Sequence, residues 1–226
     1  MRIAALIGAV VLILVAFFQG GDSSSSWFAV QNIEIKGNLR FSTKEELQKD
    51  YGALLGQSLL TTSLVSIKSI ALSPEWVESV EVRKVWPNTL QILVREYKPL
   101  AYWRDGQMIS TGAVVISPHS VPSMPLPRLY GPEDTSDLVL EQFGLISQVL
   151  SSTSLRIKIL KLELRGAWDI TFNNGVRVKL GREDILERLQ RFLAVYKSDL
   201  SGRIDQISSI DARYPHGVAV AWKKTK

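Results

Sequence analysis

The stretch that decides the fold is residues 80–103, which read VEVRKVWPNTLQILVREYKPLAYW. Apolar and polar side chains alternate on both sides of Pro87-Asn88, a dipeptide typical of turns. The pattern predicts two strands joined at this turn as a hairpin. The expected core positions are Val80, Val82 and Val85 on the first strand, and Leu90, Ile92 and Val94 on the second.

Upstream of this hairpin the sequence predicts one strand followed by two short helices. Residues 28–37, FAVQNIEIKG, alternate as a strand does. Ser42 and Glu45 have the spacing of a capping box, which predicts the start of the first helix. The second helix stops before Pro74. The order strand, helix, helix, strand, strand predicts a small α+β domain over residues 28–97. Its further core positions are Val30, Ile33, Ile35, Leu64, Ile67 and Ile70.

In the rest of the chain, residues 98–226, the pattern of turns and apolar residues predicts a mostly antiparallel β domain with two helices. Asp105-Gly106 and Asn174-Gly175 are typical hairpin turns, and Gly112 marks one more. The last two strands are QISSID and GVAVAW. Five prolines between residues 118 and 132 exclude long regular elements there. The expected core positions are Leu138, Phe143, Ile146 and Leu150; Ile157, Ile159, Leu162 and Leu164; and Ile185, Leu189, Phe192, Tyr196 and Leu200.

The beginning of the chain has no charged residue between Arg2 and Asp22. Its apolar run predicts an uncleaved transmembrane helix over residues 3–21, after a cytoplasmic tail at residues 1–2 and before a linker at residues 22–27. The run ends in AFFQGG, which fits a signal-peptide cleavage site poorly. A buried helix, the other alternative, would carry polar residues on one face. Arg2 predicts a cytoplasmic N-terminus, with the bulk of the chain across the membrane.

Residues that carry chemistry are scarce. The chain has no cysteine, and His119 and His216 have no second histidine at metal-ligand spacing. No nucleophile elbow or phosphate-binding loop is present, and Glu45/Glu46 and Glu183/Asp184 suit helix starts. The 27 basic and 22 acidic side chains are dispersed, without the basic stripe that nucleic-acid binding needs. We therefore expect no enzyme, catalytic residue, metal, cofactor, nucleic acid or small-molecule substrate.

The terminal strand, Val218 to Trp222, is uncharged and lies close to the end of the sequence. Alternation places Val218, Val220 and Trp222 on one face. An exposed edge of this kind invites another chain to pair. Tyr214 and Trp222 are residue types that dominate binding hot spots, and Arg213 could pair with a partner carboxylate. From these residues alone two alternatives stay open: a final strand whose aromatic residues lie in the core, or a docking edge.

Four segments of the chain resemble the FtsQ/DivIB family of bacterial cell division proteins, in its Gram-negative form. They are residues 80–103, LPRLYGPE at 126–133, residues 170–192 from ITFNNG to ERLQRF, and DARYPHGVAVAW at 211–222. The resemblance implies one transmembrane helix, a POTRA domain at residues 28–97 and a C-terminal β domain at residues 98–226. It also implies a non-enzymatic scaffold of the division septum, in the inner membrane with its bulk in the periplasm.

The same resemblance implies two partner sites. One binds the FtsB/FtsL complex through the β domain, at Arg213, Tyr214, Trp222 and Arg165, with His216, Gly217 and Val218 in the same segment; His216 stands where the family usually has a small polar residue. The other receives upstream divisome proteins on the POTRA strand with Val82 and Lys84, of which we expect Lys84 to be exposed. POTRA domains also serve outer-membrane assembly and secretion. That alternative predicts several repeats and a barrel, which the sequence lacks. A periplasmic hydrolase, a third class, would need a polar site that these residues do not assemble.

Overall fold

The computed structural model describes residues 26–223. It divides between Tyr97 and Lys98 into two compact units, called unit 1 and unit 2 below. None of the helices within residues 26–223 is long and apolar enough to cross a membrane. The predicted membrane span, residues 3–21, lies outside the described residues.

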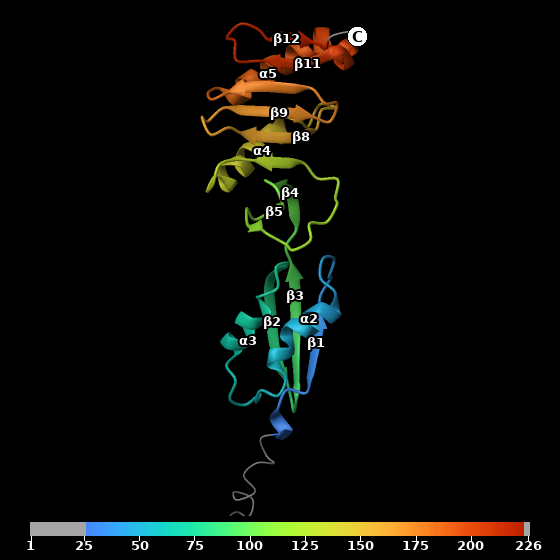
Figure 1. Ribbon diagram of the computed structural model, residues 1–226, viewed down its shortest axis with the longest axis vertical. Helices are drawn as coiled ribbons and strands as arrows, with labels where there is room; N and C mark the ends of the chain where they lie inside the picture. Colours follow the sequence, from blue (N-terminus) through green and yellow to red (C-terminus); the bar gives the residue numbers. More distant parts are fainter. Residues whose placement is uncertain (1–25, 224–226) are drawn as a thin grey trace, which may run out of the picture. The chain divides into compact units, whose positions relative to one another are not determined.

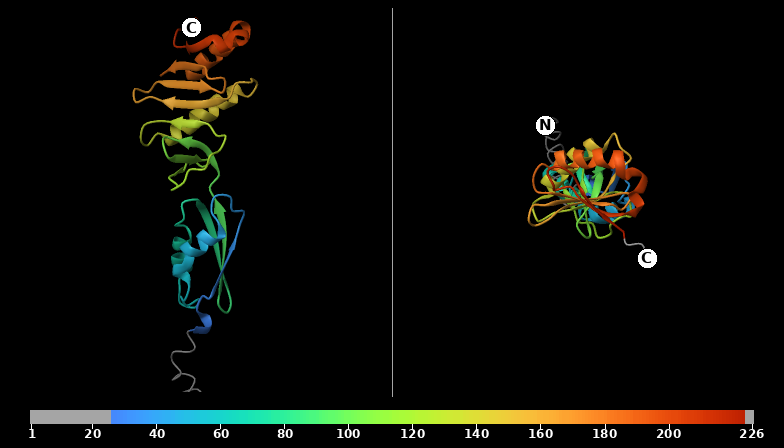
Figure 2. Two further views of the ribbon diagram at one scale, coloured as in Figure 1. Left: turned by 45° about the vertical axis from the view of Figure 1, so that its right-hand side comes forward. Right: turned by 90° about the horizontal axis from the view of Figure 1, so that it is seen from above.

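Unit 1 is a three-stranded sheet with two helices, as far as it is described (Figure 1). Strand β3 is central; it pairs antiparallel with β2 and parallel with β1. The helices lie on one face of this sheet (Figure 2). The expected order of strand, helix, helix, strand, strand is therefore confirmed. The elements are η1 (Ser26–Phe28), β1 (Asn32–Lys36), α2 (Lys44–Asp50), η2 (Tyr51–Leu54), α3 (Leu64–Ala71), β2 (Val77–Val85) and β3 (Thr89–Glu96).

The core of unit 1 lies between the sheet and its helices. Every second residue of β3 is buried, and Val80 on β2 is buried with them. Val82 is only partly buried against this core. Two expected core positions were wrong: Val85 is exposed at the end of β2, where the strand enters the turn, and Leu64 is exposed at the start of α3. The buried β3 positions are Leu90, Ile92 and Val94, and Val30, Ile35 and Ile67 are buried as expected.

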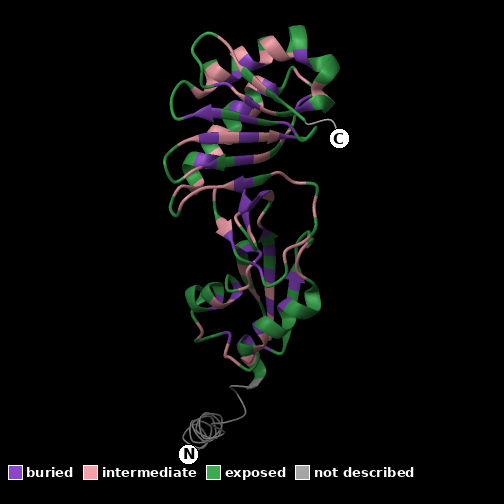
Figure 3. Ribbon diagram, turned by 45° about the horizontal axis from the view of Figure 1, so that its top comes forward, coloured by how far each residue is buried: buried purple, intermediate pink, exposed green. Residues whose placement is uncertain are grey.

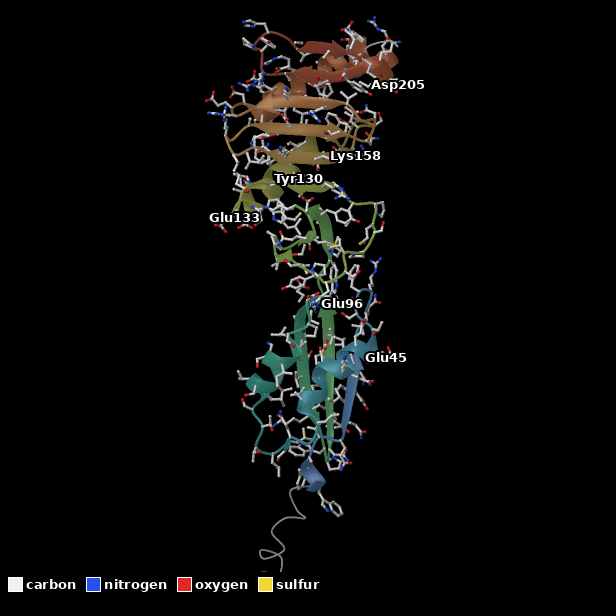
Figure 4. All side chains as sticks on the ribbon, viewed as in Figure 1. Glu45, Glu96, Tyr130, Glu133, Lys158 and Asp205 are labelled. Carbon is white, nitrogen blue, oxygen red and sulfur yellow. The ribbon has the colours of Figure 1, made fainter. Side chains whose placement is uncertain are left out.

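The capping box of α2 lies one residue later than expected. Thr43 accepts the N–H of Glu46 at 3.2 Å, and the Glu46 carboxylate accepts the N–H of Thr43 at 2.8 Å. The bond from the backbone N–H of Thr43 is the main cause that lowers the pKa of Glu46. The N–H of Ser42 donates instead to the carboxylate of Glu96, which is why Ser42 is not the cap. Figure 4 labels Glu96 at the end of β3.

Unit 2 contains a nine-stranded sheet within the described residues, in the order β12-β11-β10-β9-β8-β7-β4-β5-β6. Five of its eight pairings are antiparallel, which confirms a mostly antiparallel sheet. Asp105-Gly106 and Asn174-Gly175 lie in hairpin turns as expected. The strands are β4 (Pro99–Trp103), β5 (Gln107–Ser110), β6 (Val115–Ile116), β7 (Arg128–Tyr130), β8 (Ile157–Leu162), β9 (Trp168–Phe172), β10 (Arg177–Gly181), β11 (Ile207–Asp211) and β12 (Ala219–Trp222).

Two contacting helices, α4 (Ser136–Leu150) and α5 (Ile185–Val195), cover one face of this sheet (Figure 2). A π-helical turn, η3 (Tyr196–Leu200), and a 3₁₀ helix, η4 (Ser201–Gln206), follow α5. The predicted stripe of α5 is confirmed: its members are buried or pack against the core. In strands β7 to β11 the buried side chains are separated by less buried ones (Figure 3). The uncovered face of β7 to β12 therefore has no buried side chain.

Three core positions of unit 2 were predicted wrongly: Leu138, Leu164 and Ile159. On α4, Leu138 is exposed and Val139 is buried in its place, because the inner face of the helix starts one residue later. Leu164 is 90% exposed, since β8 ends at Leu162 and Leu164 lies in the turn beyond it. On β8 itself the buried residues are Leu160 and Leu162, because a register shift follows Ile157.

Candidate functional site

Strand β12 is one edge of the described sheet in unit 2. It pairs antiparallel with β11, with Asp211 opposite Ala219 and Ile210 opposite Val220. The N–H of Lys223 donates to the carbonyl of Gln206 at 2.7 Å, so the backbone of Lys223 faces β11. Since these directions alternate along a strand, the N–H and C=O groups of Val220 and Trp222 point away from the sheet. The edge therefore offers backbone donors and acceptors to an added strand.

The side chains of β12 differ between its two faces. Val218 and Val220 pack partly against the core on the helix-covered face, as the alternation predicts. On the other face Ala219 and Ala221 are exposed and small, so that an approaching segment meets no bulky side chain there. Trp222 is 46% exposed and Tyr214 is 55% exposed. Neither aromatic residue is a core residue, which removes one of the two alternatives left open by the sequence.

Arg213 is already paired within the chain. Its Nε donates to both carboxylate oxygens of Asp211, at 2.8 and 3.0 Å, and its Nη2 donates to one of them. The backbone N–H of Arg213 also donates to Asp211, at 3.1 Å. This hydrogen bonding lowers the pKa of Asp211 and raises the pKa of Arg213. A partner carboxylate would therefore share Arg213 with Asp211, rather than meet an unpaired guanidinium.

Helix α5 holds the loop that carries Tyr214. Nη1 of Arg191 donates to the carbonyl of Tyr214 at 2.7 Å, and Nη2 of Arg191 donates to Glu187 one helical turn earlier, also at 2.7 Å. The backbone of Tyr214 is thus fixed to a rigid element while its ring stays exposed. At the other end of the site the guanidinium of Arg203 lies 5.4 Å from the ring centroid of Trp222, a cation–π contact.

The uncovered face next to β12 carries a row of alternating charges. Across the neighbouring strands Lys161 lies opposite Asp169, Asp169 opposite Lys179, and Lys179 opposite Asp211. The row ends at Ala219 on the edge strand. Burial, and then the neighbouring Glu163, raise the pKa of Asp169 in spite of the basic side chains beside it. A strand added to β12 would continue this row.

The other predicted partner residues of unit 2 are spread more widely. His216 is exposed in the loop between β11 and β12, and Gly217 and Val218 are half-buried there. Arg165 is exposed in the turn between β8 and β9, and β10 and β11 separate those strands from β12. Three strand spacings are roughly 14 Å. A segment paired with β12 would have to cross that distance to contact Arg165.

In unit 1, Val82 and Lys84 lie on β2, an edge of the described sheet. The expectation that Lys84 is exposed was wrong: its side chain is half-buried. Its ammonium donates to the carbonyls of Leu59 and Thr62, the latter at 2.7 Å, and so holds the loop before α3. Because these two carbonyl groups accept its hydrogen bonds, the Lys84 ammonium is drawn toward the loop and away from solvent.

Three residues of the C-terminal site were missed by sequence reasoning: Asp211, Arg191 and Arg203. Asp211 had a signal, because it precedes Arg213 by two residues at a strand end, where both side chains point the same way. Arg191 and Arg203 had none, since their contacts with Tyr214 and Trp222 depend on how the helices pack. No group of three or more His, Asp or Glu within residues 26–223 is placed to hold a metal ion.

Comparison with known proteins gives the class. Residues 28–97 match the family model described as the FtsQ-type POTRA domain, and residues 101–213 match the model of the C-terminal part of the cell division proteins FtsQ/DivIB. These matches define a class in which a POTRA domain precedes a C-terminal β domain, in agreement with the α+β fold observed here. The chain belongs to the FtsQ/DivIB family of cell division proteins.

Individual relatives agree. The chain is 34% identical to the cell division protein FtsQ of Coxiella burnetii over 70% of its own length, and 31% identical to that of Cellvibrio japonicus over 85%. It spans 65% and 60%, respectively, of the lengths of these two relatives. It is 30% identical to FtsQ of Escherichia coli over 85% of this chain and 72% of the relative. The family is not a known enzyme family.

Proposed function

We propose that this chain is a non-enzymatic scaffold of the division septum that is anchored in the inner membrane. In this proposal residues 3–21 span the membrane, the chain before them lies in the cytoplasm, and both units lie in the periplasm. The support is the uncharged stretch between Arg2 and Asp22, together with membership of a cell division family. The scaffold links early and late division proteins through contacts on its two units.

The observation that carries this function is the open edge of β12. We propose that a segment of FtsB, arriving with FtsL, pairs with this edge by β-augmentation. The outward backbone groups of Val220 and Trp222 would supply affinity, as main-chain bonds do in this mode of recognition. The exposed rings of Tyr214 and Trp222 would supply specificity. Arg213, His216, Gly217 and Val218 line the approach, and Arg165 would contact a more distant part of the partner.

The test is a titration of the full chain in detergent with the periplasmic part of FtsB. Tyr214→Ala and Trp222→Ala should each weaken binding about 30-fold, the equivalent of about 2 kcal/mol. Leu138→Ala, at an exposed side chain of α4, is the matched control and should bind as the unchanged protein does. Wild-type affinity of both aromatic variants, with unchanged thermal unfolding, would rule out this docking edge.

A proline scan separates strand pairing from side-chain contact. The N–H of Val220 points away from β11, so Val220→Pro removes no bond within the sheet but removes a donor for an added strand. It should abolish FtsB binding and lower the melting temperature less than Ala221→Pro does, because only the partial packing of the Val220 side chain is lost. Ala221→Pro removes an inward donor and should lower the melting temperature. Tight binding by Val220→Pro would contradict β-augmentation.

We also propose that β2 receives an upstream division protein near Val82 and Lys84. The support is the position of β2 at an edge of the described sheet and the partial exposure of both side chains. Lys84→Met should reduce recruitment to the septum. Arg83→Met, at the neighbouring exposed residue whose guanidinium pairs with Glu81, is the control. Thermal unfolding must accompany this test, because Lys84 also holds a loop. Unchanged recruitment of a folded Lys84→Met protein would remove this surface from the proposal.

A further inference from the structure

One end of unit 1 carries exposed apolar side chains from three separate segments. Trp27 is 73% exposed, Leu60 is 60% exposed and Trp86 is 54% exposed. Val85, next to Trp86, is also exposed. These four residues are called the apolar rim below. Side chains of this size are individually common on surfaces, but several of them at one end of a domain indicate a contact surface.

Contacts between the three segments show that the rim is one surface. The N–H of Leu59, next to Leu60, donates to the carbonyl of Phe28 at 2.7 Å. The ring of Phe28 meets that of Trp86 edge to face, with centroids 5.8 Å apart. Lys84 ties the loop that carries Leu60 to β2 through the carbonyls of Leu59 and Thr62. The rim is therefore held in place by specific bonds, although its side chains face solvent.

The segments that form this end contain no acidic residue. Residues 26–33, 56–67 and 84–89 include a single charged side chain, that of Lys84. Polar residues here are uncharged, such as Gln31 and Asn88, whose side chains bond to each other at 2.8 Å. Tryptophan, other apolar side chains and an occasional lysine, without carboxylates, are the composition typical of a protein surface at the level of lipid headgroups.

The position of the rim in the chain favours a lipid surface over another occupant. Only residues 22–26 separate the proposed membrane span from Trp27. Even fully extended, that connection reaches about 20 Å. The end of unit 1 that begins at Ser26, which is the end bearing the rim, is thus tethered close to the bilayer.

We propose that the apolar rim of unit 1 inserts into the headgroup region of the membrane in which the chain is anchored. The inference rests on the proposed membrane anchor. Trp27, Leu60 and Trp86 enter the interface, and Lys84 keeps the loop of Leu60 in position. Unit 1 is then held against the bilayer by its own side chains, in addition to its tether.

The test uses the full chain in nanodiscs of phosphatidylcholine and phosphatidylglycerol whose acyl chains are brominated near the headgroup. Bromine quenches tryptophan fluorescence at short range, and the rim holds two of the six tryptophans. The Trp27→Phe/Trp86→Phe variant should lose most of the quenching seen with the unchanged protein. Trp222→Phe, at an exposed tryptophan of unit 2, should keep it. Equal melting temperatures would show that each variant is folded.

The outcomes separate this inference from the proposed anchor. If the full chain fails to enter nanodiscs and alkaline carbonate releases it from membranes, both are overturned. If it is incorporated but the double variant is quenched as strongly as the unchanged protein, only the rim inference fails. Incorporation without any quenching, together with crosslinks from the rim to another protein in cells, would assign the rim to a protein partner and would equally overturn it.

Discussion

The aliphatic stem of Arg213 lies directly over Gly181. A β-carbon placed on Gly181 would stand 3.1 Å from Cγ of Arg213, and 2.5 Å from Nη1 of Arg188. Gly181 ends β10 at φ 82°, in the left-handed region that favours glycine. The approach of Arg213 to the sheet therefore depends on the absence of a side chain at the end of the neighbouring strand.

We expect Gly181→Ala to lower the free energy of unfolding by about 1–3 kcal/mol, from backbone strain and displacement of Arg213. FtsB binding should weaken as well, if Arg213 belongs to the partner site. Gly144→Ala in α4 is the matched control. A β-carbon there has nothing within 4 Å, so the same substitution should stabilise the helix by about 0.5–1 kcal/mol. Urea unfolding of both variants tests this prediction. Equal changes in the free energy of unfolding would contradict it.

The Asp211–Arg213 pair should make stability depend on pH. The bonds from Arg213 hold the pKa of Asp211 below its ordinary value, so their stabilisation is complete above the unfolded pKa of about 3.9 and is lost as the pH falls through the folded pKa. Arg213→Gln should cost about 1 kcal/mol or less at pH 7, because Arg213 is 56% exposed and water screens the pair. The melting temperatures of the two proteins should converge once the pH is well below the folded pKa of Asp211, where its carboxyl is protonated. A difference that persists there would have another cause.

The substitution Asp169→Asn should raise the stability of the protein at pH 7, whereas Arg213→Gln lowers it. Burial raises the pKa of Asp169, so ionising this carboxyl in the folded state costs free energy at pH values above its folded pKa. The variant should melt about 1–3 °C higher at pH 7, and the gain should vanish as the pH falls and Asp169 takes up a proton. If Asp169→Asn melts lower at pH 7, the attraction of Lys161 and Lys179 outweighs desolvation, and the prediction is wrong.

Glu96 should be a main support of unit 1. Its buried carboxylate accepts the backbone N–H groups of Arg40, Phe41 and Ser42, at 2.6, 3.1 and 2.8 Å. Glu96→Gln keeps the size but turns one acceptor into a donor facing these donors. The free energy of unfolding of the variant should be lower by about 2–3 kcal/mol. The amide hydrogens of residues 40–42 should exchange faster with solvent. Glu78→Gln, on the exposed side of β2, is the control and should stay within about 0.5 kcal/mol.

Most of the fold could be predicted from local patterns. Alternation fixed the buried face of β3, and Asn174-Gly175 located the β9–β10 hairpin, because both signals act over a few residues. The errors lie where an element ends or a register shifts. Leu164 lies beyond the end of β8, and Val85 is the last residue of β2. The N-cap of α2 is Thr43 and not Ser42, because the carboxylate of Glu96, distant in the sequence, accepts the N–H of Ser42.

The candidate site was predictable in part for the same reason. Strand β12, its alternation and the residue types of Tyr214 and Trp222 can be read along the chain. The bond from Arg191 to the Tyr214 carbonyl and the stacking of Arg203 on Trp222 join residues brought together only by packing. The sequence also could not show that the Lys84 ammonium is already hydrogen-bonded, since its acceptors, the carbonyls of Leu59 and Thr62, lie more than 20 residues away along the chain.

The place of β12 also decides how readily it opens. It is bonded to a single neighbour, β11, whereas each interior strand is held on two sides. Edge strands of this kind unfold locally at a free energy below that of the whole domain, so β12 should be among the first parts of unit 2 to exchange its amide hydrogens. A segment paired with its outer edge would give β12 a second neighbour. Binding would then be recorded as slower exchange in β12 itself, before any change reaches the interior of the sheet.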